Sequence, residues 1–266
     1  AESLGSLSEQ ARACNYMGDA ARDVGDYEEA DRLFGRALEL WGRIGDAEGM
    51  AGAQNNLANL AMSRGDLEGA ARRHRLALAA FEQIGNVNGA ALARANLAIL
   101  ALENGRAEEA IAEAGRSLAL LDDPGAGLLH ALTRVVLGEG HLAAGAWDEA
   151  ERVFRGVLGS EPPPLAVAGA ERGLGRIALA RGDAGTALDR LEIALAAFGR
   201  LERKQEAART LLDIAEARHR RGQINEARDA VASAIEGFDR IGATADAERA
   251  RALSLRLGLT TTDLRN

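Results

Sequence analysis

The sequence predicts an all-α fold, an α-solenoid in which about six helix hairpins stack and one further helix covers the last hairpin. The main observation is a repeat. A glycine followed by a short, mostly polar turn recurs with a spacing of 40 residues four times and 37 residues once, at Gly25, Gly65, Gly105, Gly145, Gly182 and Gly222. The apolar residues on both sides recur every three or four positions and are mostly Ala and Leu, which is typical of helices. A fixed period of this length indicates stacked repeats.

Each of these glycines is predicted to join two helices. Gly65 adopts a positive φ without steric penalty and therefore ends the first helix. Asp66 offers a carboxylate to the free N–H groups that open the second helix, and Glu68 suits the positive end of that helix dipole. One repeat is therefore a helix hairpin with a tight turn.

Small residues stand where the two helices of a hairpin must cross, because helices approach to about 8–10 Å when the contacting side chains are small. Seven residues before the turn glycine are Gly18, Ala58, Ala98, Gly138, Gly175 and Ala215, and five residues after it are Ala30, Ala70, Ala110, Ala150, Ala187 and Ala227. Eight residues before it, larger apolar residues are expected to fill the hairpin core, at Met17, Leu57, Leu97, Leu137, Leu174 and Ile214.

We expect the chain to be a single solenoid domain over residues 1–266. The predicted repeats cover residues 8–45, 46–85, 86–124, 125–161, 162–202 and 203–242, and the covering helix residues 244–257. A stretch rich in Asp, Pro and Gly breaks the helical pattern at residues 122–125. A covering helix is expected because the end of a repeat array needs a polar outer surface.

Composition and charge argue against several classes of function. The net charge is −8 and the pI is about 5.2, whereas a general binder of nucleic acid or of anionic membranes needs a basic surface. Cys14 is the single cysteine, which excludes an internal disulfide and favours a cytoplasmic location. No run approaches the ~20 apolar residues of a membrane span. Because the chain begins at Ala1 rather than Met, we expect it to be part of a longer protein.

The sequence contains no evident catalytic constellation, so we expect no enzymatic activity, no metal and no cofactor. The phosphate-binding pattern Gly-x-x-x-x-Gly-Lys-Ser/Thr is absent. The four histidines, at positions 74, 130, 141 and 219, form no His-x-x-x-His pair of the kind that binds zinc. Cys14 has no nearby histidine in the sequence to activate its thiol, and a structural thiol is the simpler interpretation.

Consensus residues of a known family recur at the expected spacings. They are Met17-Gly18, Tyr27, Ala30, Phe34 and Ala37 in one repeat, and Leu137-Gly138, Trp147, Ala150, Phe154 and Pro162 in another. This pattern resembles the tetratricopeptide repeat (TPR) in a longer form of about 40 residues. The resemblance implies a right-handed superhelix whose first helices line a concave face. It also implies an interaction module, because this subfamily includes sensor regions of bacterial signal-transduction ATPases and transcriptional regulators, and scaffolds such as kinesin light chain.

On this resemblance we expect the sensor or scaffold region of a bacterial regulatory protein. It would bind a protein, a peptide or a small effector in its concave groove and would bind neither nucleic acid nor a membrane. Two alternatives stay open, a stand-alone adaptor that docks an unstructured peptide tail and the regulatory arm of an enzyme encoded elsewhere in a longer chain. TPR arrays serve many unrelated partners, so the fold alone does not choose among them.

The resemblance also places four residues of each first helix on the concave face, at 13, 10, 6 and 3 positions before the turn glycine. The predicted binding residues among these are Arg12, Asn15, Asn55, Asn59, Leu92, Ile99, Leu102, Leu132, Val135, Leu142, Arg172, Arg176 and Arg209. The predicted face is therefore polar at one end, apolar in the middle and basic at the other end.

Each of these three sets has two interpretations. The asparagine amides either hold the backbone of an extended ligand, since each offers donors and acceptors, or bond within the scaffold. The apolar residues either form a docking patch or pack between adjacent helices. The arginines either form a solvated face or bind a carboxylate or phosphate, which the fork of a guanidinium fits.

Overall fold

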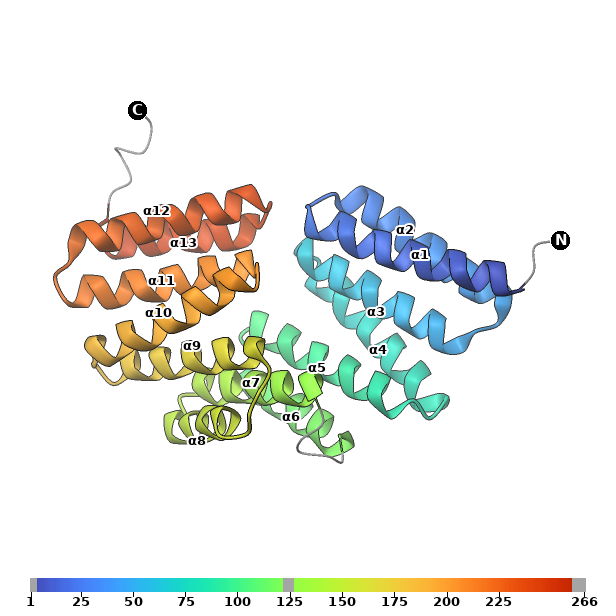
Figure 1. Cartoon of the computed structure of the whole chain (residues 1–266), viewed down its shortest axis with the longest axis horizontal. Helices are drawn as coiled ribbons and strands as arrows, with labels where there is room; N and C mark the ends of the chain where they lie inside the picture. The colour runs from blue at the N-terminus through green and yellow to red at the C-terminus, as the bar shows by residue number, and fades with distance from the viewer. Residues whose placement is uncertain (1–3, 122–126, 260–266) are drawn as a thin grey trace. The chain divides into compact units, whose positions relative to one another are not determined.

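The computed structural model describes residues 4–121 and 127–259, and in these two stretches it contains thirteen α-helices and no strand (Figure 1). The all-α prediction is confirmed. The predicted break at residues 122–125 falls outside the described residues.

The chain divides into two compact units, Ala1–Ala126 and Gly127–Asn266, which we call unit 1 and unit 2. Unit 1 contains α1 (Leu4–Asp23), α2 (Tyr27–Ile44), α3 (Ala47–Ser63), α4 (Leu67–Gln83), α5 (Val87–Glu103) and α6 (Ala107–Leu120). Unit 2 contains α7 (Gly127–Ala143), α8 (Trp147–Leu158), α9 (Pro164–Ala180), α10 (Ala184–Arg200), α11 (Lys204–Arg220), α12 (Ile224–Arg240) and α13 (Thr244–Arg256). That all residues form a single domain stays a prediction.

The turns within the hairpins have the predicted chemistry. Gly65 has a φ of 79°, and the five other turn glycines also have positive φ values. The Asp66 carboxylate accepts a hydrogen bond from the backbone N–H of Gly69 at 2.8 Å and so caps α4. Arg106 stands at the corresponding position before α6, and that helix begins without a side-chain cap. The glycine is therefore sufficient to form the turn, and the aspartate adds stability.

In three hairpins, a glycine on one helix faces a large side chain on the other where the two helices cross. A Cβ atom on Gly18 would lie 2.6 Å from the ring of Phe34, and one on Gly138 would lie 2.5 Å from the ring of Phe154. Three hairpins carry alanine instead of this glycine, and each has a side chain smaller than phenylalanine nine residues after its turn glycine. These combinations are Ala58 with His74, Ala98 with Ala114, and Ala215 with Val231. Where the second helix carries phenylalanine at this position, the first helix thus carries glycine.

The larger apolar residues expected in the hairpin core are buried with one clear exception. Leu57, Leu97, Leu174 and Ile214 are at most 9% exposed, and Leu137 is half-buried. Met17, at the same position of α1, is 56% exposed. The prediction is wrong for Met17 because the preceding hairpin covers this position, as Ala30 and Phe34 cover Leu57, and no helix precedes α1 among the described residues.

Each unit curves toward its first helices. In unit 1, α1 contacts α3 and α3 contacts α5, whereas in its described residues no contact joins α2 to α4 or α4 to α6. In unit 2, α7 contacts α9, α9 contacts α11 and α11 contacts α13, and within the described stretch no such contacts join α8, α10 and α12. Closer packing on one side of a stack bends it to that side. The first helices therefore form the inner face of each unit.

Candidate partner-binding surface

The inner face of unit 1 is formed by α1, α3 and α5, and six of the predicted binding residues on these helices are exposed or half-buried. We call them the unit 1 inner row. Two of them are exposed, Arg12 and Leu92, and four are half-buried, Asn15, Asn59, Ile99 and Leu102. Asn55 belongs to the same set of sequence positions but is buried, with 4% of its surface exposed.

Asn55 joins three helices of unit 1 through its side chain. Its Oδ1 accepts a hydrogen bond from Nδ2 of Asn96 on α5 at 3.0 Å and lies 3.1 Å from Nδ1 of His74 on α4. Burial lowers the pKa of His74 to about 4, so the ring is neutral near pH 7, and the tautomer with the proton on Nδ1 satisfies this contact. The amide of Asn55 therefore forms hydrogen bonds within the scaffold, which is the second of the two interpretations of the asparagines.

Asn15 occupies the position in α1 that corresponds to Asn55 but lacks the same partners. Its Oδ1 is shielded from water and has no hydrogen-bond partner in the described part of the chain. The residue as a whole is half-buried. A shielded acceptor without a partner is unfavourable by about 1–3 kcal/mol.

Three apolar residues of the unit 1 inner row come from α5. Leu92 is 38% exposed, and Ile99 and Leu102 are half-buried. The hairpin core is supplied by other residues of the same helix, Leu97 and Leu100, which are buried. Apolar area therefore remains on the inner side of α5 after the hairpin has formed.

The corresponding apolar residues of unit 2 are part of its packing. Leu142 is buried in the cluster around Phe154, and Leu132 and Val135 pack against that cluster. Val135 also contacts α9 closely, because a Cβ atom on Gly169 would lie 2.8 Å from its methyl carbon Cγ1. Leu142, Leu132 and Val135 thus pack between helices, which is the second of the two interpretations, whereas Leu92 on α5 is exposed.

The arginines predicted at the basic end bind carboxylates of neighbouring first helices. Arg172 pairs with Asp213 at 2.7 Å, and Arg176 pairs with Glu139 and approaches Asp213 at 4.0 Å. On the next pair of helices, Arg209 lies 3.0 Å from Asp246. We call these three pairs with their shared carboxylates the unit 2 ion ladder.

The ladder contains three arginines and three carboxylates, so their formal charges balance. Burial raises the pKa of the Glu139 carboxyl, but the adjacent guanidinium groups of Arg176 and Arg172 outweigh burial and hold that pKa below its ordinary value. Glu139 in turn raises the pKa of Arg176. An added anion would therefore compete with a carboxylate already in place, and the predicted carboxylate or phosphate grip is occupied by the protein itself.

Asp213 and Asp246 were not among the predicted binding residues, although they complete the ladder. Their partners stand 41 and 37 residues away in the sequence, close to one repeat. Asn96 likewise bonds Asn55 across 41 residues. Contacts between successive first helices could therefore be predicted by searching the sequence for pairs of complementary polar side chains that stand 37 to 41 residues apart.

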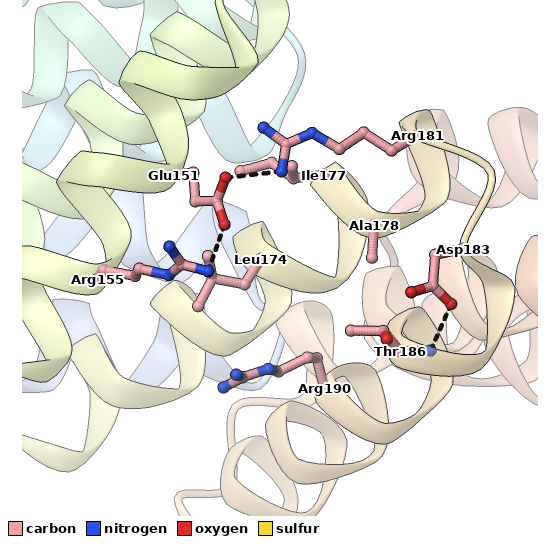
Figure 2. Close-up of a pocket in the computed structure, with 9 residues that line it drawn as sticks. All are labelled: Glu151, Arg155, Leu174, Ile177, Ala178, Arg181, Asp183, Thr186 and Arg190. Atoms are coloured by element: carbon pink, nitrogen blue, oxygen red, sulfur yellow. Dashed lines mark hydrogen bonds and ion pairs between the residues drawn. The ribbon is translucent and has the colours of Figure 1, made fainter.

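A small pocket of about 150 Å³ opens between α8, α9 and α10 of unit 2 (Figure 2). Leu174, Ile177 and Ala178 form its apolar part. Its charged side chains are paired: Glu151 pairs with Arg155 and Arg181, each at 2.6 Å, as the dashed lines of Figure 2 show, and Arg190 pairs with Glu171 at 2.8 Å. The pocket therefore presents no unbalanced charge to a ligand.

The described residues contain neither a metal-binding cluster nor a membrane-spanning helix. No group of three or more His, Cys, Asp or Glu side chains in residues 4–121 and 127–259 is placed to hold a metal ion. Over the same residues, no helix has the length and apolar character needed to cross a membrane.

The repeat pattern and the hairpin geometry agree with a comparison of the sequence with known protein families. Residues 9–83, which reach from α1 to the end of α4, match the tetratricopeptide repeat family. Tetratricopeptide repeats are therefore assigned to residues 9–83 of the chain. No curated protein sequence matches the chain at a significant level.

Solved TPR-like structures share the fold at low sequence identity. BtubC (BKLC) from P. vanneervenii is 19% identical with a TM-score of 0.58, and the match covers 75% of this chain and 91% of that protein. A Rap protein complexed with Competence and Sporulation Factor is 14% identical with a TM-score of 0.65, covering 94% and 76%. The TPR sensor protein of the STAND ATPase class from Pyrococcus horikoshii is 14% identical with a TM-score of 0.61, covering 98% of this chain and 41% of that one. At these identities the likeness concerns the fold alone.

Proposed function

We propose that this TPR protein is a non-catalytic interaction module, the scaffold or sensor part of a regulatory protein, and that it binds a peptide segment of its partner on the unit 1 inner row. The observation that carries the proposal is the apolar area that Leu92, Ile99 and Leu102 leave on the inner side of α5. Apolar area of this kind beside polar groups is typical of interaction sites.

The chemistry of the row favours a peptide in an extended conformation. Its apolar side chains would contact α5, while its backbone N–H and C=O groups would meet the amides of Asn15 and Asn59 on α1 and α3. Two Rap proteins of similar fold were solved with peptide factors, one with Competence and Sporulation Factor and one with the Phr* peptide. Their likeness supports the mode of binding and does not name the ligand.

The experiment is a selection of random peptides displayed on phage against the full chain, followed by calorimetric titration of the enriched peptides. The test variant is Leu92→Asp with Ile99→Asp, and the matched control is Leu76→Asp, a residue of α4 that is 61% exposed and lies outside the row. We expect the test variant to weaken binding at least about tenfold, since burying an unpaired carboxylate in an apolar contact is unfavourable. The control should bind as the wild type does.

Two results would refute the proposal. One is that no peptide is enriched over the background of the empty support. The other is that the enriched peptides bind the double variant as tightly as the wild type while circular dichroism shows both to be equally helical. In either case the inner side of α5 is not the binding surface.

A further inference from the structure

The pocket between α8, α9 and α10 lies inside unit 2, and further helices precede and follow these three along the chain. Its volume is about 150 Å³. Leu174, Ile177 and Ala178 of α9 form its apolar side, and each of them is at most 9% exposed. The pocket is therefore formed by consecutive helices in the interior of the repeat array.

The pocket is open at a position where two other repeats carry a large side chain. Ala178 stands four residues before its turn glycine, and the residues at this position in α7 and α11 are His141 and Arg218. The guanidinium of Arg218 lies 3.5 Å from the carboxylate of Glu192 on α10. It also donates to the backbone C=O of Glu226 on α12, at 3.5 Å. The Arg218 side chain thus crosses the space between three helices.

The equivalent space in the preceding repeat is the pocket. The residues that correspond there to Glu192 and Glu226 are Arg155 of α8 and Thr186 of α10, and both line the pocket. The alanine at position 178 leaves open the volume that an arginine fills one repeat later. The site can therefore receive a ligand about as large as that side chain.

The charges around the pocket favour an uncharged ligand. Arg155 and Arg181 both pair with Glu151, each at 2.6 Å. Arg190 pairs with Glu171 at 2.8 Å. A charged ligand would have to displace one of these partners and leave it without its counter-charge, whereas an uncharged ligand would displace none.

The pocket has the size and the surroundings of a site for an aromatic ring. An apolar cavity of about 150 Å³ in another protein holds benzene. Guanidinium groups stack on the faces of aromatic rings, and the three arginines Arg155, Arg181 and Arg190 line the pocket beside its apolar residues (Figure 2). Both contacts of Arg190 with Glu171 are made by Nη1. Hydrogen bonds lie in the plane of a guanidinium, so this pairing leaves its flat faces available for stacking.

We propose that this pocket binds a small uncharged aromatic compound, about the size of phenol or indole. The ring would lie against Leu174 and Ile177, in the space that corresponds to the one Arg218 fills in the next repeat, with guanidinium groups against its faces. The proposal is independent of peptide binding on the unit 1 inner row, because the two sites share no residue.

The probe is 4-fluorophenol, which is uncharged near pH 7 and is followed by its fluorine NMR signal during titration with the full chain. We expect saturable binding with a dissociation constant of about 1 mM or lower, which is in the range of small ligands in apolar pockets. Cyclohexanol has a similar size but no aromatic face, and it should bind at least about threefold more weakly. Benzoate carries a charge and should also bind more weakly.

Ala178→Arg should weaken binding of 4-fluorophenol at least about tenfold, because the new side chain would fill the pocket as Arg218 fills the equivalent space. Ala61→Arg on α3 is the matched control, since it stands at the same repeat position outside the pocket, and it should bind as the wild type does. Circular dichroism checks that both variants fold. Ala178→His introduces the residue type found at this position in α7 and should show the same loss of binding, so it decides the test if Ala178→Arg does not fold.

Absence of saturable binding to the wild type would overturn the proposal. Equal binding of 4-fluorophenol to a folded Ala178→Arg or Ala178→His variant would also overturn it, since the compound would then lie elsewhere on the chain. Cyclohexanol that binds as tightly as 4-fluorophenol would refute the aromatic class of ligand, and benzoate that binds more tightly would refute an uncharged one.

Discussion

Acid is expected to destabilise unit 1 through His74. The side chain is fully buried, and burial lowers its pKa from 6.5 to about 4. At pH 5 the imidazole is therefore neutral in the folded protein, whereas in the unfolded chain it is mostly protonated. Because the unfolded state then binds more protons, the free energy of unfolding falls as the pH is lowered from about 6.5 toward 4, and above this window it does not depend on His74.

With these two pKa values, linkage predicts a loss of about 2 kcal/mol from the free energy of unfolding between pH 7 and pH 5. The assay is urea unfolding of the full chain at both pH values, followed by the fluorescence of Trp41. A Trp147→Phe background makes the signal specific for unit 1. The test variant is His74→Val, because valine stands at the same repeat position beside Ala215, as Val231.

His74→Val should be less stable than the wild type at pH 7, since it removes the contact with Asn55 and leaves a small cavity. Between pH 7 and pH 5, its free energy of unfolding should fall by about 2 kcal/mol less than that of the wild type. His219→Gln on α11 serves as the control and should keep the pH dependence of the wild type. If wild type and His74→Val lose the same free energy within about 0.5 kcal/mol, the buried neutral imidazole is not the cause and the reasoning fails.

The other expectations concern packing and the ion ladder. His74→Phe should overpack the crossing against Ala58 and lower the free energy of unfolding by about 1–3 kcal/mol, and Ala58→Gly in the same chain should restore most of it, as thermal melts would report. Asp213→Asn removes the carboxylate 2.7 Å from Arg172 and should destabilise unit 2 by about 1–3 kcal/mol in urea unfolding, and less in about 1 M NaCl. Glu236→Gln, in an exposed pair on α12, should change stability by less than about 0.5 kcal/mol in the same measurement.

The hairpins could be predicted from the sequence because their determinants are local. Gly65 and Asp66 specify a turn through backbone conformation and capping, and these act within a few residues. The fully buried alanines five residues after each turn glycine follow from the same local register. Because the pattern recurs in six repeats, the same local inference applies to all six hairpins.

The inner face was harder to predict, because the state of each side chain depends on partners a repeat away. Asn15 and Asn55 stand at equivalent positions, yet Asn55 is bonded by His74 and Asn96 while the shielded oxygen of Asn15 has no partner among the described residues. Met17 and Leu57 likewise share a register and differ in burial. The local sequence pattern gives the residue type at a position, whereas the neighbouring hairpin determines whether its side chain is buried and which hydrogen bonds it makes.

The polar contacts between first helices bear on how a partner would bind. The Asn55 cluster joins α3, α4 and α5 in unit 1, and the ion ladder joins the first helices of unit 2. Breaking either would leave buried polar or charged groups unpaired, so each holds neighbouring first helices in one register. In unit 1, α3 and α5 carry Asn59, Leu92, Ile99 and Leu102 of the inner row, and their spacing is therefore set before a partner arrives. A surface ordered in advance loses less conformational entropy on binding, which allows a short peptide to bind with useful affinity through few contacts.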